Sequence, residues 1–240
     1  MKRKQILLCV LIAAVGFVVS SCWTMGPSIK GNGNVTEEVR EVKNFDRIKA
    51  SRGINVYITQ GSPAKVLVIA DNNLHEVIGT KVNGGVLEIY AEADIRRAEE
   101  KKVMVTVETL REISASTGAN VYSQNQFVAD DLELSATTGS NLTMEVNAQN
   151  LEADCSTGSN IILSGMAKKA ELEGSTGANL KGEQLKTGHC IMRATVGANV
   201  HATVSEQLEA RASTGGNIVY YGEPSSTDIE NSTGGNIHGR

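Results

Sequence analysis

Apolar and polar residues alternate with the period of a β-strand over most of the chain after residue 35. The runs INVYITQG, AKVLVIA, VLEIYAEA and VMVTVETL, all between residues 35 and 110, are apolar or alternating and have the length of strands. VNGGV at 82–86 predicts a hairpin turn, residues 71–79 a single helical turn, and the charged segment 93–102 a solvated loop. The pattern predicts an all-β protein.

From about residue 111 the alternation becomes periodic around the motif Ser/Thr-Thr/Val-Gly-small-Asn. Its first residue recurs at intervals of 21, 19, 19, 20, 18 and 19, at Ser116, Thr137, Ser156, Ser175, Thr195, Ser213 and Ser232. The positions one, three and five before it are apolar or small in nearly every copy, and the fifth position after it is always aliphatic. A period of about 19 with strands on both sides of a turn predicts a β-helix, or solenoid, whose rungs stack at about 4.8 Å.

The turn itself predicts a ladder along one edge of the solenoid. Gly occupies the third position in every copy and takes positive φ without a steric cost. Every copy ends in an Asn, whose amide can bond to backbone or to the Asn one rung away: Asn120, Asn141, Asn160, Asn179, Asn199, Asn217 and Asn236. We expect a structural role for this turn ladder. A second hypothesis is that the slender edge is a polar ridge that a glycan or protein approaches closely.

A second column of the repeat is acidic. Four residues before the first turn residue, six of seven copies have a carboxylate: Glu112, Glu133, Glu152, Glu171, Glu209 and Asp228, with Ile191 as the exception. These acids have outward parity, and we call them the acidic stripe. Stacked carboxylates repel one another, modestly in water. The stripe either keeps a flat sheet soluble and free of aggregation, or binds divalent cations or a basic partner surface.

The first 22 residues have the features of an export signal. Lys2, Arg3 and Lys4 precede an apolar run from residue 6 to 19, and Val19-Ser20-Ser21-Cys22 resembles the bacterial lipoprotein signal, in which the cysteine is lipidated. Trp23 after the cysteine favours the outer membrane over retention in the inner one. Residues 23–34 are rich in Gly, Asn and other polar residues and predict a flexible tether. Residues 35–240 then form a single domain.

Two cysteines, Cys155 and Cys190, remain in the folded part. Both fall on inward positions of the repeat, which predicts buried structural thiols, with a disulfide as the alternative in an oxidising envelope. We predict no metal site, because no His has the inward register and the outward ones lie far apart along the stack. No cofactor is predicted, and the net charge of -4 argues against a nucleic-acid partner.

Three segments carry a family resemblance. GNGNVTEEVREVKNFDRIKASRGINVYITQG at 31–61, then VNGGVLEIY and TLREISASTGANV, resemble the auto-transporter adhesin head domain, or GIN domain, of Bacteroidetes envelope lipoproteins. Gly53-Ile54-Asn55 matches the name directly, and the resemblance covers residues 35–240. It implies a right-handed parallel β-helix of two main sheets, pectin-lyase-like in shape, and a role in adhesion. It carries over no catalytic residues.

Three functions remain open at this point. The first is a non-catalytic, lipid-anchored binding module on the cell surface that presents its turn edge and acidic face to glycans or proteins. The second is a structural or sensing lipoprotein that faces the periplasm. The third and weakest is a polysaccharide-active enzyme, since the acids form a stripe without a cleft-making insertion. The last rung ends soon after its turn and is barely capped, so we also expect a homodimer through that end.

Overall fold

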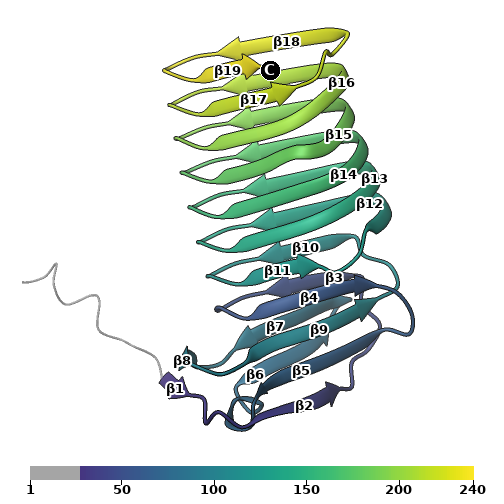
Figure 1. The fold of residues 1–240 in the computed structure, drawn as a ribbon, viewed down its shortest axis with the longest axis vertical. Helices are drawn as coiled ribbons and strands as arrows, with labels where there is room; N and C mark the ends of the chain where they lie inside the picture. Colours follow the sequence, from purple (N-terminus) through teal and green to yellow (C-terminus); the bar gives the residue numbers. More distant parts are fainter. Residues whose placement is uncertain (1–27) are drawn as a thin grey trace, which may run out of the picture.

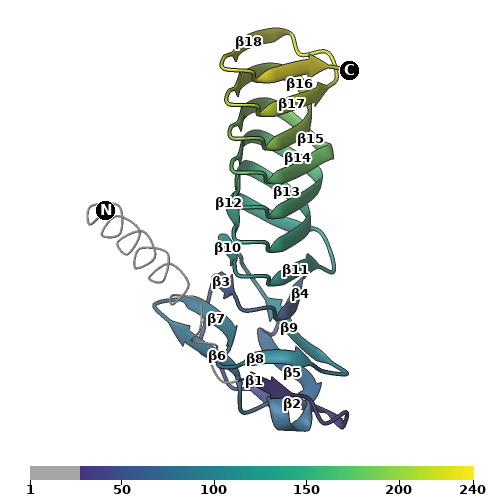
Figure 2. The same cartoon turned by 90° about the vertical axis from the view of Figure 1, so that its left-hand side faces the viewer.

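The computed structural model describes residues 28–240; the predicted signal, Cys22 and residues 23–27 of the tether lie outside them. Within the described residues the chain is all-β, as predicted, with one short 3₁₀ helix, η1 (Asn72–Leu74). No helix in this part of the chain is long and apolar enough to cross a membrane. The coils stack into one straight column above a broader N-terminal part (Figures 1 and 2).

The strands in chain order are β1 (Ser28–Lys30), β2 (Val35–Arg40), β3 (Arg47–Ala50), β4 (Asn55–Gln60), β5 (Lys65–Asp71), β6 (Ile78–Asn83), β7 (Val86–Ala91), β8 (Asp94–Arg97), β9 (Lys101–Val107), β10 (Glu112–Ala115), β11 (Asn120–Ser123), β12 (Phe127–Ala136), β13 (Asn141–Cys155), β14 (Asn160–Gly174), β15 (Asn179–Ala194), β16 (Asn199–Ala212), β17 (Asn217–Tyr221), β18 (Ser226–Asn231) and β19 (Asn236–Gly239).

Each regular coil is one long bent strand closed by a tight turn. In β13 every second residue is buried until two exposed residues, Gln149 and Asn150, follow one another, and burial then resumes with Leu151. This break in alternation marks the curved edge, opposite the tight turns (Figure 1). Each coil therefore has a post-turn wall, such as residues 141–148, and a pre-turn wall, such as residues 151–155. The two sheets of the prediction are these walls, joined in one continuous parallel ladder.

The turn has two left-handed residues. In the first copy the N–H of Ala119 donates to the carbonyl of Ser116 (3.1 Å), and both Thr117 (φ 49°) and Gly118 (φ 73°) have positive φ. This is the geometry of a type I′ turn, in which both central residues have positive φ. The N–H of Gly118 also donates to the carbonyl of Thr138 in the next coil (3.1 Å). The turns therefore stack through hydrogen bonds of their own.

The small residue after the Gly points inward. Ser159 is fully buried, and its hydroxyl donates to the carbonyl of Ala136 (2.7 Å). Ala119, Ala178 and Ala198 are also fully buried. This position is small because it packs inside the coil, and not to keep the outer edge slender, as the sequence was interpreted above.

The left-handed residue before the Gly gives a stability prediction. Val196 has φ 50° and is half-exposed, and a β-branched residue in this region is strained. Since Asn tolerates the left-handed region, we expect Val196→Asn to stabilise the protein by about 1 kcal/mol. Urea unfolding measures it. Val128→Asn is the control, because Val128 is exposed on an ordinary strand and Asn is unfavourable there. An equal gain in both variants would contradict the argument.

An eighth copy of the turn lies far upstream. Ser51-Arg52-Gly53-Ile54-Asn55 has the same pair of positive φ angles, at Arg52 (57°) and Gly53 (69°), and connects β3 to β4. β3 and β4 pair in parallel with β10 and β11, although about 50 residues separate them in the chain. The pattern Ser-x-Gly-x-Asn-Val was present in the sequence, but the long insertion between this copy and the next concealed it.

The insertion forms the N-terminal end of the stack. β7 and β9 add a further coil beneath β3 and β4, again in parallel. The antiparallel strands β6, β5 and β2 then close the column from below. The hairpin predicted at 82–86 connects β6 to β7. The charged segment 93–102 is not a loop throughout, because β8 lies within it and pairs with β1.

The described part of the predicted tether is held on this end of the stack. Ser28–Lys30 form β1, and the N–H of Gly33 donates to the carboxylate of Asp71 (2.8 Å). The side-chain amide of Asn73 donates to the carbonyl of Lys30 (2.9 Å) and accepts from the N–H of Asn32 (3.0 Å). Residues 28–34 therefore differ from the flexible segment predicted, because side chains of the folded part satisfy their backbone.

Both folded cysteines are buried and free, as the repeat predicted. Burial raises the pKa of Cys190 to about 12. Burial also raises the pKa of Cys155, against the effect of a contact with the hydroxyl of Ser159. Neither thiol is a nucleophile at neutral pH.

Candidate functional site

The acidic stripe forms a column in register on the pre-turn wall. Glu112 pairs with Glu133, Glu133 with Glu152, and Glu152 with Glu171, and the register continues through Ile191 and Glu209 to Asp228. Parallel in-register pairing places each carboxylate about 4.8 Å from the next along the stack. At the N-terminal side the column continues into Arg47 of β3, which pairs with Glu112.

A groove of about 820 Å³ runs beside this column. Its lining extends from β3 to β16, a span of seven rungs or roughly 29 Å. Buried inward residues form its floor, including Leu132, Leu151 and Ala170. The acidic stripe forms one bank. The other bank is the column at the curved edge, two residues earlier in each coil: Asp131, Asn150, Lys169, His189 and Gln207.

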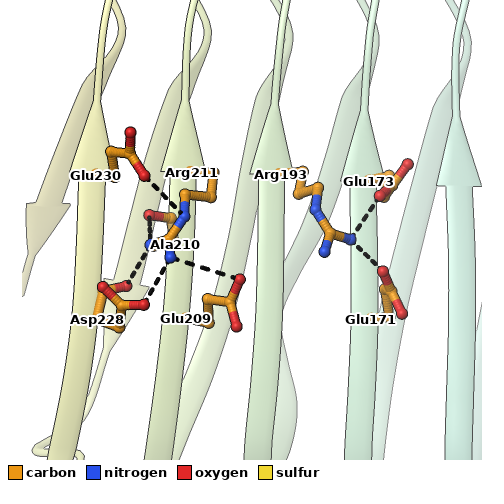
Figure 3. Close-up of polar contacts among 8 residues, drawn as sticks. All are labelled: Glu171, Glu173, Arg193, Glu209, Ala210, Arg211, Asp228 and Glu230. Atoms are coloured by element: carbon orange, nitrogen blue, oxygen red, sulfur yellow. Dashed lines mark hydrogen bonds and ion pairs between the residues drawn. The ribbon is translucent and has the colours of Figure 1, made fainter.

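Arginines neutralise the C-terminal half of the stripe (Figure 3). Arg193 donates to the carboxylates of both Glu171 and Glu173, the second at 2.7 Å. Arg211 lies 2.6 Å from Asp228 and 3.7 Å from Glu209. Hydrogen bonds to Glu171 and Glu173 raise the pKa of Arg193, so the guanidinium stays charged. The sequence predicts repulsion between neighbouring carboxylates along the whole acidic stripe. Over these rungs the two arginines relieve that repulsion.

The N-terminal half of the stripe has no such relief. Glu112, Glu133 and Glu152 have no ion-pair partner among residues 28–240, and neither does Asp154, which is half-buried two residues after Glu152. Burial raises the pKa of Asp154, and the charges of Glu173, Glu152, Glu133 and Glu171 raise it further. Negative charge is concentrated on these rungs.

This pKa shift predicts a pH-dependent effect. Because the pKa of Asp154 is raised in the folded state, its ionised carboxylate destabilises the folded protein at pH values above that raised pKa. The destabilisation disappears as the pH falls below 3.8, the ordinary pKa of an aspartate. Asp154→Asn should therefore stabilise the protein at pH 7 by about 0.5 kcal/mol, with no gain in strong acid. Chemical unfolding at several pH values measures it. Asp130→Asn, at an exposed position on the preceding coil, is the control, and a gain that persists in acid would contradict the assignment.

The asparagines of the turn ladder bond to one another. The side-chain N–H of Asn141 donates to the carbonyl oxygen of Asn120 (2.8 Å), and the same bond recurs up the stack at 2.9 to 3.1 Å as far as Asn199, then at 3.4 Å. The ladder begins one coil earlier than predicted, with Asn55 accepting from Asn120 (2.9 Å). These amides hold adjacent coils in register, and the ladder lies outside the groove lining.

Sequence reasoning located the stripe but missed the arginines. They belong to the second outward column of the same wall: Ser114, Ser135, Asp154, Glu173, Arg193, Arg211 and Glu230. Aligning the residue two before the turn would have found this column. The groove itself has no signal in the sequence, because it depends on how the coil bends at its curved edge. Within residues 28–240, no group of three or more His, Cys, Asp or Glu side chains is placed to hold a metal ion.

Comparisons with known proteins agree with the coil-stack fold. A family model described as "Putative auto-transporter adhesin, head GIN domain" matches residues 44–224. A "putative adhesin" from Bacteroides fragilis has a similar structure, with a TM-score of 0.82 and 20% identity over 88% of this chain and 100% of its own.

Two structures from Parabacteroides distasonis, each with a TM-score of 0.71, share the fold. A "putative adhesin" is 20% identical over 89% of this chain and 100% of its own. A "Putative lipid binding protein" is 17% identical over 88% and 99%. At these identities the likeness concerns the fold alone. No curated protein matches the chain significantly.

Proposed function

Because the chain belongs to the GIN head-domain family of auto-transporter adhesins, we propose that it is a non-catalytic adhesion module of the bacterial envelope. The observation that carries the proposal is the groove along seven rungs of the coil stack, with the acidic stripe as one bank. A long, open groove on a repetitive scaffold suits an extended partner better than a small substrate. Its ligand is a glycan or a protein.

The proposal includes a lipid anchor at Cys22 and a place on the outer face of the outer membrane. The lipoprotein-like segment Val19-Ser20-Ser21-Cys22 and Trp23 support it. In the producing bacterium, Cys22→Ala should release the protein from the membrane fraction. The alternative is an anchored lipoprotein with a structural or sensing role that faces the periplasm.

Protease shaving and antibody labelling of intact cells distinguish these two arrangements. Surface exposure predicts labelling and digestion on unbroken cells, while a periplasmic protein used as a lysis control stays protected. Protection until the outer membrane is opened would contradict adhesion and favour the periplasm-facing alternative. Depletion of a polymer substrate by the purified protein would overturn the non-catalytic assignment.

A homodimer is the remaining part of the proposal. β18 pairs with β16, and β19 with β17, so the other edges of β18 and β19 have no strand partner among residues 28–240. All six residues of β18 are exposed. Open edges of this kind favour pairing with a second chain. Light scattering at high concentration tests it, and a strictly monomeric protein would count against it.

A further inference from the structure

The floor and banks of the groove differ in chemistry. Leu132, Leu151, Ala170 and Cys190 make the floor apolar, and Ile191 interrupts the acidic bank. A ligand that lies in the groove therefore exchanges water for apolar contact beneath it. It meets a row of carboxylates along one side, whereas the other side has a single carboxylate, that of Asp131.

The charge of the groove is unbalanced. Six carboxylates line it, those of Glu112, Asp131, Glu133, Glu152, Glu171 and Glu209, against three Arg and Lys side chains, those of Arg47, Arg111 and Lys169; the one histidine, His189, lies beside Glu206. Arg111 and Arg47 are both paired with Asp46, at 2.5 and 3.6 Å. Glu133 and Glu152 form no ion pair among the described residues, and Asp154 stands beside them on the same wall. The middle of the groove is therefore its most negative part.

This unpaired charge has a cost in the free protein. Two unit charges about 4 Å apart interact by about 1 kcal/mol even in water. Glu133 and Glu152 are in register, so they repel each other, and their charges add to the effect of burial in raising the pKa of Asp154. A cationic partner would relieve this repulsion, whereas a neutral one would leave it unchanged.

The lining also argues against other partners. It contains no Phe, Tyr or Trp side chain on which a sugar ring could stack. The carboxylate bank repels nucleic acids and acidic polysaccharides. A lone divalent ion lacks a group of ligands within residues 28–240. Lys and Arg side chains combine a positive head with an apolar stem, which matches an acidic bank beside an apolar floor.

We propose that the groove binds an extended, lysine- or arginine-rich polypeptide segment, with its cationic side chains at Glu133 and Glu152. This inference rests on the proposed function as a binding module and specifies its partner class. The segment lies along the stack, and at about 3.4 Å per residue some eight extended residues span the groove of roughly 29 Å. Further along the stripe, Arg193 is paired with Glu171 and Arg211 with Asp228. These acids are already neutralised, so the site is confined to the N-terminal rungs of the groove.

The test is binding of fluorescein-labelled hexalysine to purified protein, followed by anisotropy at about 10 mM ionic strength, where screening is weak. Glu133→Gln/Glu152→Gln should weaken binding by about tenfold or more. The same variant should raise the thermal midpoint, because it removes repulsion, so weaker binding cannot come from misfolding. The control Glu76→Gln/Glu145→Gln removes two exposed charges away from the groove and should change affinity by less than about twofold.

Three outcomes would overturn the inference. Hexalysine that fails to bind excludes the cationic partner. An equal loss in the control variant shows general attraction to an acidic protein. A glucosamine hexamer that binds more tightly than hexalysine, with the same dependence on Glu133 and Glu152, identifies a polysaccharide partner instead. None of these outcomes affects the labelling of intact cells, so the proposed function succeeds or fails separately.

Discussion

Replacing Asp71 by asparagine is expected to destabilise the protein by about 3 kcal/mol, since hydrogen bonds to a buried carboxylate are strong and costly to lose. Asp71 is fully buried at the end of β5. Its carboxylate accepts from the backbone N–H groups of Gly33 (2.8 Å), Glu99 (3.1 Å) and Glu100 (3.0 Å). An asparagine amide can accept at one of its two positions only, so at least one of these N–H groups would face another donor.

The effect should depend on pH in a defined direction. Burial alone would raise the pKa of Asp71, but hydrogen bonds from the N–H groups of Glu100, Gly33, Glu99 and Asp71 itself outweigh it and lower the pKa below 3.8. A carboxylate whose pKa is lower in the folded state stabilises the protein at pH values above its unfolded-state pKa. This stabilisation is lost as the pH falls through the folded-state pKa. The difference between wild type and Asp71→Asn should therefore shrink as the pH falls below 3.8.

Urea unfolding at neutral and acid pH measures this difference. Asp94→Asn is the matched control, because Asp94 is exposed on β8 in the same end of the stack and should change stability by no more than about 0.5 kcal/mol. Hydrogen exchange at Gly33, Glu99 and Glu100 should accelerate in Asp71→Asn alone. Equal stability of the two variants would show that the carboxylate does not hold these segments.

Replacing Gly216 by alanine should cost about 3 kcal/mol, near the upper end for overpacking, because the obstacle is backbone. An added Cβ would lie 2.1 Å from the carbonyl oxygen of Ala194 and 2.4 Å from its carbonyl carbon. One coil earlier, the same turn position is Ala198, which is fully buried. The later turn therefore lies closer to the coil beneath it, and only glycine fits.

Ala198→Gly is the control for Gly216→Ala. It removes a methyl group at the same turn position, adds glycine flexibility and should cost only about 1 kcal/mol. In a repeat protein each coil contacts only its neighbours, so the damage should be local. Hydrogen exchange should show loss of protection in β17, β18 and β19 of Gly216→Ala while β13 stays protected. Uniform loss along the stack, or similar costs for both variants, would contradict this account.

Much of the candidate site could be predicted from the repeat. Period-2 alternation within a period of about 19 placed Glu133 and Glu152 on one outward column, and the structure pairs them in register. The function of that column could not be derived in the same way. Neutralisation by Arg193 and Arg211 depends on a neighbouring column, and the groove depends on the bend of each coil.

The N-terminal half was predicted less well because its contacts are not local. Ser51 to Asn55 repeats the turn, yet its neighbours in the stack are β10 and β11, which come after the whole insertion. A periodic pattern predicts contacts between consecutive copies, and the insertion breaks that order. Residues 28–34 look like a polar linker, but the buried carboxylate of Asp71 binds their backbone.

The sequence by itself determined the class of the fold, the period of its coils, the inward residues and the turn, because each follows from local backbone preference and side-chain parity repeated copy by copy. Only the tertiary structure decided that a distant segment supplies a coil, that antiparallel strands close the N-terminal end, and that an apolar-floored groove lies beside the acidic stripe. These features depend on where the backbone bends and on which distant groups meet, and a single repeat unit contains neither.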